Sequence, residues 1–218
     1  PISMSPENIN IKCLILDIYN KKHFKFDSLK FLLNDLSLEF NLSDTFIITN
    51  HLKKKKENKF NIFNVPKRMQ GNDFNQGDIL QWGLNKINKK GFFPDYILYL
   101  NADYVYRKKG IIQQMINEAC LKGLDSVIVG QRDYSDYFIY DNQKKEYLPI
   151  TRDLKNRKNK IPYFRAIYGL ATLTKSKMIR RGKFIDSENI GIIPIDDYKY
   201  NLRISDKQMH PIIKKLLI

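Results

Sequence analysis

Apolar residues occur along the chain in two patterns, short runs and longer segments at helical spacing. The short runs have the length and composition of buried β-strands, and they lie at residues 11–17, 45–49, 60–65, 96–100, 126–129 and 190–195. Segments with apolar residues at helical spacing lie between or after these runs, at residues 29–40, 76–89, 109–121 and 206–217. Strands that alternate with helices predict a three-layer α/β fold, a mostly parallel sheet with helices on both faces.

Residues 131–160 depart from this alternation. Two short aromatic segments flank the turn sequence Asp141-Asn142, a pattern that predicts a β-hairpin. A basic loop follows up to residue 160, and the chain then returns to a strand that runs through Gly169. We therefore expect one domain over residues 11–218 with 131–160 as a hairpin and loop insertion, preceded by a tail over residues 1–10.

The charge balance bears on the kind of partner. The chain has 38 Lys and Arg against 23 Asp and Glu, a formal net charge of +15. Such an excess suits an anionic partner, but the basic residues are scattered, whereas a nucleic-acid-binding face shows them clustered. Biased composition or an anionic small ligand is therefore favoured over nucleic acid.

The cysteines and the apolar runs bear on location. Cys13 and Cys120 each lie in an apolar run, and two buried thiols without a Cys-x-x-Cys pair fit a reducing, cytoplasmic compartment. The longest apolar runs are far shorter than the roughly 20 residues that a membrane span needs. The polar first ten residues do not predict a signal peptide. We expect a cytoplasmic protein with no membrane partner.

Asp103 is the strongest single candidate for chemistry. It follows the run at 96–100, and ligands of open α/β sheets bind just beyond the carboxyl ends of the strands. A carboxylate there can hold Mg²⁺, which bridges nucleotide phosphates, and the amide of Asn101 can coordinate or bind a base. The candidates for a second carboxylate ligand are Asp196, Asp197 and Asp206. The alternatives are a turn role for Asp103 and an N-cap role for Asp206.

No phosphate-binding glycine loop, metalloprotease motif or serine nucleophile motif is present in the sequence. Basic side chains must then bind any anionic substrate, and Arg157, Lys158 and Arg165 are the candidates. Arginine grips a carboxylate through two parallel hydrogen bonds. The alternative for these residues is a solvated, charged loop.

The order of the segments resembles the acylneuraminate cytidylyltransferase family over roughly residues 11–215. Residues 95–100 and the Asn101 turn look like that family's strand with its Leu-Gln-Pro-Thr-Ser-Pro-Leu-Arg turn, and residues 125–129 match its Asp-Ser-Val-Val strand. Residues 156–171, with Asn156-Arg157-Lys158, Pro162 and Tyr168-Gly169-Leu170-Ala171, look like its Arg-Gln, Pro and Asn-Gly-Ala-Ile-Tyr block. Residues 201–206 fall where the family has its Asp-Ile-Asp metal motif.

The resemblance implies a nucleotidyltransferase fold and the reaction of CTP with an acidic sugar, giving a CMP-sugar and pyrophosphate with Mg²⁺. By this resemblance, Asp103, Lys21 and Arg157 are the expected catalytic residues. The nucleotide would contact Lys21, Lys22, Asn101 and Asp103, and the sugar would contact Arg157, Lys158, Arg165, Tyr168 and Gly169. The implied metal ligands are Asp103 and Asp206.

The sequence also departs from the family. The family's opening Ala-Arg-x-x-Ser-Lys phosphate loop is absent, and Lys21 or Lys22 would have to replace it. Arg203 and Ser205 occupy the places of the two Asp-Ile-Asp aspartates, and Tyr168 replaces the asparagine expected at the sugar. Three hypotheses stay open: a diverged enzyme with its metal at Asp103, a GT-A-type glycosyltransferase, and a non-catalytic binding member of the fold. A homodimer also stays open.

Overall fold

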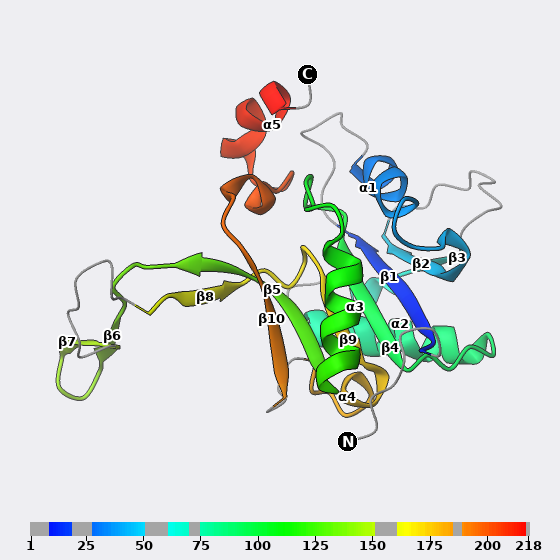
Figure 1. The fold of residues 1–218 in the computed structure, drawn as a ribbon, viewed down its shortest axis with the longest axis horizontal. Helices are drawn as coiled ribbons and strands as arrows, with labels where there is room; N and C mark the ends of the chain where they lie inside the picture. The colour runs from blue at the N-terminus through cyan, green and yellow to red at the C-terminus, as the bar shows by residue number, and fades with distance from the viewer. Residues whose placement is uncertain are drawn as a thin grey trace.

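The computed structural model describes residues 9–18, 28–50, 61–69, 75–150, 161–184 and 189–216. Within these residues one eight-stranded sheet forms the centre of the molecule (Figure 1). The strand order is β10-β5-β9-β4-β1-β2-β3, and β8 pairs with β5 beside this path. The strands are β1 (Ile11–Asp17), β2 (Thr45–Thr49), β3 (Asn61–Asn64), β4 (Tyr96–Asn101), β5 (Ser126–Asp133), β8 (Tyr163–Ala166), β9 (Thr172–Lys175) and β10 (Ile190–Ile195).

Most strand pairs are parallel, as the sequence predicts. β1 pairs in parallel with β2 and β4, β2 with β3, and β5 with β10. β9 is inserted antiparallel between β4 and β5. The prediction of a mostly parallel α/β sheet is therefore confirmed, with β9 reversed at its centre and β8 antiparallel to β5 beside it.

The single strand expected through Gly169 is wrong in detail, because the chain leaves the ladder there. β9 pairs with the first half of β5, residues 126–128, and β8 pairs with its second half, residues 130–133. Between them lies a turn closed by a hydrogen bond from Leu170 N to Ile167 O, 3.0 Å long. The turn is held toward β4 because Asn101 N donates to Gly169 O over 2.8 Å. This hydrogen bond brings residues 168–170 to the carboxyl end of the central strand.

Helices cover both faces of the sheet. α1 (Ser28–Leu36) and α3 (Ile111–Lys122) pack on one face, and α2 (Gln76–Lys89) and α4 (Ser176–Arg180) pack on the other. The alternation of side chains along a strand explains this division. In β1, Cys13 and Ile15 belong to the core below α1 and α3, whereas Leu14 and Leu16 belong to the core below α2.

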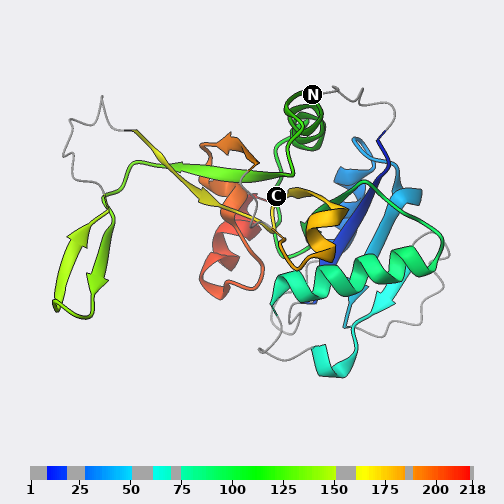
Figure 2. The same cartoon turned by 90° about the horizontal axis from the view of Figure 1, so that it is seen from below.

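A separate two-stranded hairpin is formed by β6 (Phe138–Asp141) and β7 (Glu146–Pro149). It stands away from the main sheet, at the end of the extension made by β5 and β8 (Figures 1 and 2). Its large apolar side chains are exposed, among them Phe138 and Tyr147. No helix within the described ranges has the length and apolar content to span a lipid bilayer.

The C-terminal segment lies across the carboxyl edge of the sheet. It contains the 3₁₀ turns η6 (Tyr198–Asn201) and η7 (Lys207–Met209) and the helix α5 (His210–Leu216). The helix predicted over 206–217 thus begins at His210, because Asp206 caps a 3₁₀ turn by accepting from Gln208 N over 3.1 Å. A small core of Val105, Leu202, Ile204 and Ile213 joins the segment to the chain that follows β4. Two further 3₁₀ turns are η3 (Leu42–Asp44) and η4 (Lys67–Met69).

Candidate active site

The turn after β4 is fixed at the carboxyl edge of the sheet. The side-chain oxygen of Asn101 accepts the N–H of Asp103 over 2.9 Å, an Asx-type turn that suits this residue pair. Ala102 is fully buried, and its N–H donates to Leu16 O over 2.9 Å. Asp103 therefore stands beyond the ends of β4 and β1, where the strand pattern predicts a functional residue.

The carboxylate of Asp103 binds the C-terminal segment. Ser205 N donates to Oδ1 over 2.6 Å, and Ser205 Oγ donates to Oδ2 over 2.5 Å. Ile204 N donates to the carbonyl oxygen of Asp103 over 2.9 Å, so this one residue accepts three hydrogen bonds from the segment. The side chain is only 5% exposed. In this arrangement Asp103 joins two distant segments of the chain.

Arg107 holds the same turn from inside, and sequence reasoning did not select it. Its guanidinium donates to three backbone carbonyls: Nε to Leu170 O over 2.8 Å, Nη1 to Tyr104 O over 3.1 Å and Nη2 to Asn101 O over 2.6 Å. Burial lowers the pKa of Arg107 to about 10, so the side chain is charged at neutral pH. The available signal was its place at the end of residues 100–107, where the resembling family's turn ends in arginine.

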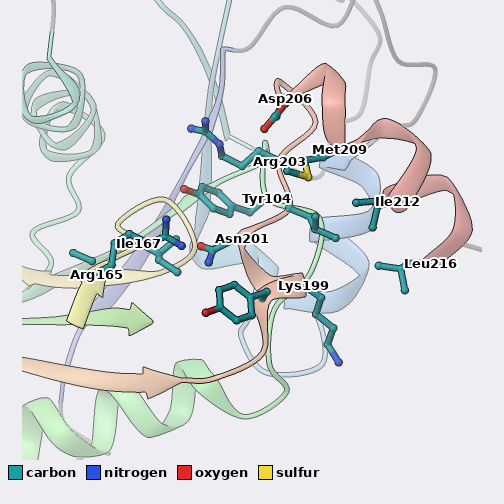
Figure 3. A pocket seen from close by; sticks show the side chains of 13 residues that line it. Tyr104, Arg165, Ile167, Lys199, Asn201, Arg203, Asp206, Met209, Ile212 and Leu216 are labelled. Carbon is teal, nitrogen blue, oxygen red and sulfur yellow. The ribbon is translucent and has the colours of Figure 1, made fainter. Parts of the chain in front are cut away.

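A cavity of about 720 Å³ opens beside this turn (Figure 3). Residues from the turn after β4, from β8 and from the C-terminal segment line it. Its polar side carries the side chains of Tyr104, Arg165, Asn201 and Arg203. Its apolar side carries Met209, Ile212 and Leu216. A ligand with both a charged group and an apolar group fits such a division.

The charge of this cavity is mainly positive. Arg165, Lys199 and Arg203 line it together with one carboxylate, that of Asp206. Lys199 Nζ lies 2.9 Å from Asp197 Oδ2, and the hydrogen bond to Asp197 raises the pKa of Lys199. Arg165 Nη2 donates to Gln131 Oε1 over 2.8 Å. Because the amide of Gln131 is neutral, this hydrogen bond leaves the positive charge of Arg165 in place. The cavity can therefore bind an anion.

Arg203 and Tyr104 form one side of the cavity as a pair. Their backbones make an isolated antiparallel bridge, and the nearby Arg203 guanidinium acts to lower the pKa of Tyr104 against the larger effect of burial. Burial raises the pKa of Tyr104, so its hydroxyl is protonated at neutral pH. The pair presents a guanidinium and a hydroxyl, both of which can donate to ligand oxygens.

Some of the other candidate residues lie at or near the cavity, and others lie outside the described residues. Arg165 lines the cavity, and Tyr168 is 36% exposed in the turn beside it. Gly169 packs against Asn101 and Tyr104 so closely that an added Cβ would lie 2.6 Å from Tyr104 Cε2. The substrate-binding roles of these residues stay predictions. Four further candidates lie outside the described residues: Lys21, Lys22, Arg157 and Lys158.

The carboxylates expected to hold Mg²⁺ do not fit that task in this arrangement. Both oxygens of Asp103 accept hydrogen bonds from Ser205, and Asp206 accepts from Gln208 N. The described part of the chain brings together no group of three or more His, Cys, Asp or Glu side chains around a possible metal position. Asp103 accepts from the backbone and the hydroxyl of Ser205, and Asp206 accepts from a backbone N–H. The magnesium expectation stays a prediction, which titration can test.

Comparison with known proteins identifies the fold. No protein-family model matches the sequence, and no curated protein matches it. Among solved structures, the 4-diphosphocytidyl-2C-methyl-D-erythritol synthase of Anaerococcus prevotii superposes with a TM-score of 0.65 at 13% identity, covering 97% of each chain. A CMP:2-keto-3-deoxy-manno-octonic acid synthetase complexed with CTP gives a TM-score of 0.65 at 10% identity, covering 95% of this chain and 98% of that one. A second 4-diphosphocytidyl-2C-methyl-D-erythritol synthase gives 0.64 at 11% identity. The chain thus shares the fold of these structures, a nucleotide-diphospho-sugar transferase-like fold, over at least 95% of its length.

Proposed function

We propose that this chain is a nucleotidyltransferase that transfers CMP from CTP to an acidic sugar. The observation that carries the proposal is the cationic cavity of about 720 Å³ at the carboxyl edge of β4. Open α/β sheets bind ligands at this edge. The structures that share the fold over nearly all of their length include a synthetase complexed with CTP.

In the proposed reaction, a sugar hydroxyl attacks the α-phosphorus of CTP. The bond from that phosphorus to the bridging oxygen of the β-phosphate breaks, and pyrophosphate leaves with the electron pair. The hydroxyl proton passes to solvent. Such a transfer needs positioning and charge stabilisation more than covalent chemistry from the protein. Arg165 and Arg203 are suited to hold the anionic groups, because a guanidinium binds carboxylate or phosphate through two hydrogen bonds.

The apolar side of the cavity bears on the acceptor. Met209, Ile212 and Leu216 lie opposite the charged side chains. We propose that an acidic sugar places its carboxylate at Arg165 and an apolar substituent at the α5 side. Lys21, Lys22 and Asn101 are proposed to contact the nucleotide, and Arg157 and Lys158 the sugar.

The test is pyrophosphate release from CTP in the presence of a panel of acidic sugars, together with calorimetric titration of CTP and of UDP-sugars. Release of pyrophosphate that requires both CTP and sugar would support the proposal. Binding of UDP-sugars in preference to CTP would favour a GT-A-type glycosyltransferase instead. If folded protein binds neither nucleotide at millimolar concentration, the chain is a non-catalytic member of the fold.

A further inference from the structure

We infer that Arg203 supplies the positive charge that holds the nucleotide phosphates, in place of a divalent metal ion. This inference rests on the proposed function and deepens it, because it names how the same site binds its nucleotide. It follows from three features of the structure: the engaged carboxylate of Asp103, the exposed charge of Arg203, which has no ion-pair partner among the described residues, and the fixed position of Arg203 beside the Asp103 turn.

The first feature is the state of Asp103. Both carboxylate oxygens accept hydrogen bonds from Ser205, at 2.6 and 2.5 Å, and the side chain is only 5% exposed. Asp103 is also absent from the lining of the cavity, in which Arg203 and Tyr104 stand. To hold Mg²⁺, which demands near-ideal octahedral geometry and keeps several waters, Asp103 would have to release Ser205 and become exposed.

The second feature is the charge of Arg203. The residue is exposed, and it lines the cavity beside Tyr104 (Figure 3). Within the described ranges no carboxylate forms an ion pair with it, in contrast to Lys199, whose Nζ is 2.9 Å from Asp197. A guanidinium is always charged and presents several N–H donors in one plane, which matches the oxygens of a phosphate. Its charge is thus available to a ligand.

The third feature is position. The antiparallel bridge between Tyr104 and Arg203 fixes the Arg203 backbone next to the residue that follows Asp103. Ile204 N donates to Asp103 O over 2.9 Å, which holds the adjoining residue in the same register. The guanidinium therefore sits beside the Asp103 turn (Figure 3). A cation there also repels a divalent ion, which disfavours a metal at the same position.

The test is calorimetric titration of the full chain with CTP, once in EDTA and once in excess Mg²⁺. We expect dissociation constants that agree within about threefold in the two buffers. Arg203→Gln should weaken CTP binding about 10- to 100-fold in EDTA, the range for losing hydrogen bonds to a charged group. Lys207→Gln is the matched control, because it removes one exposed positive charge four residues away without touching the cavity. It should change the affinity less than about twofold.

The outcomes separate this inference from the proposed function. Tight CTP binding that appears only with Mg²⁺, or unchanged binding in Arg203→Gln, overturns the role of Arg203 and leaves the proposed function standing. Folded protein that binds CTP in neither buffer overturns both. A second readout is direct binding of Mn²⁺ alone, followed by electron paramagnetic resonance. The unmodified chain should not bind Mn²⁺ at this site, and Arg203→Asp should gain binding. The inference would be contradicted if the unmodified chain binds Mn²⁺ and Asp103→Asn abolishes that binding.

Discussion

Two arginines on either side of one turn perform different tasks. The guanidinium of Arg107, inside the turn, donates hydrogen bonds to the backbone carbonyls of Asn101, Tyr104 and Leu170. Arg203, on the segment that crosses the turn, is exposed and faces the cavity. The same type of side chain is therefore structural where backbone carbonyls surround it, and we propose that it binds a ligand where it is exposed to the cavity. The number of basic residues alone, 38 in this chain, does not distinguish the two.

The most direct test of this comparison is to remove each arginine in turn. Arg107→Met removes a donor from three part-buried carbonyl oxygens, of which only Asn101 O keeps another donor, Tyr104 N, among the residues that the structure describes. We therefore expect unfolding in urea to require about 3–5 kcal/mol less free energy, because an unsatisfied buried acceptor costs about 1–3 kcal/mol. Arg203→Met removes an exposed side chain, and surface changes of this kind usually stay within about 0.5 kcal/mol. Circular dichroism during urea unfolding measures both. Equal losses in the two variants would show that the distinction is mistaken.

The next effect concerns the packing beneath the turn. In Gly169→Ala the new Cβ would lie 2.6 Å from Tyr104 Cε2 and 3.1 Å from Asn101 Cβ. Overpacking of this kind costs about 1–3 kcal/mol, and thermal unfolding would detect it. Tyr104→Leu in the same chain removes the ring atom in closest contact, so the double variant should lose less than the sum of the single losses. Strict additivity would mean that Gly169 and Tyr104 do not share this contact.

The sheet could be predicted from sequence more closely than the segments around the site. The apolar run at 45–49 is β2, and the helical pattern at 76–89 is α2, with the same bounds. Buried strands and amphipathic helices have local signals, because burial and periodicity appear directly in the residue order. The interruption between β8 and β9 had no such signal. It depends on Asn101 N donating to Gly169 O, a tertiary contact between distant residues.

The site shows the same limit. The strand pattern predicted that Asp103 lies at the carboxyl edge of the sheet, and its turn lies there. Its partner Ser205 is 102 residues away, so no local pattern could indicate that the carboxylate is already engaged. Arg107 was missed because a basic residue shortly after a strand has the appearance of a solvated loop residue. Only the folded chain surrounds it with carbonyl groups.

A smaller effect is expected where Asp103 meets the C-terminal segment. Ser205→Ala removes the donor that lies 2.5 Å from Asp103 Oδ2 and leaves the backbone bond to Oδ1 in place. We expect a loss of about 1 kcal/mol in the free energy of unfolding, typical of one hydrogen bond. In an Asp103→Asn background the same change should cost less, because the charged acceptor is already gone. If Ser205→Ala lowers the free energy of unfolding by the same amount in the Asp103→Asn background, the two side chains do not stabilise each other.

The smallest effect is expected at Lys199, the third cation of the cavity. Its charge is shared with Asp197, 2.9 Å away, whereas Arg203 has no such partner in the described part of the chain. Lys199→Gln should therefore weaken CTP binding less than about threefold, since exposed ion pairs contribute little and are screened by salt. The measurement is calorimetric titration in the same buffers as for Arg203→Gln. A loss as large as that of Arg203→Gln would mean that Lys199 leaves Asp197 when the nucleotide binds. The site would then be completed by rearrangement of the C-terminal segment.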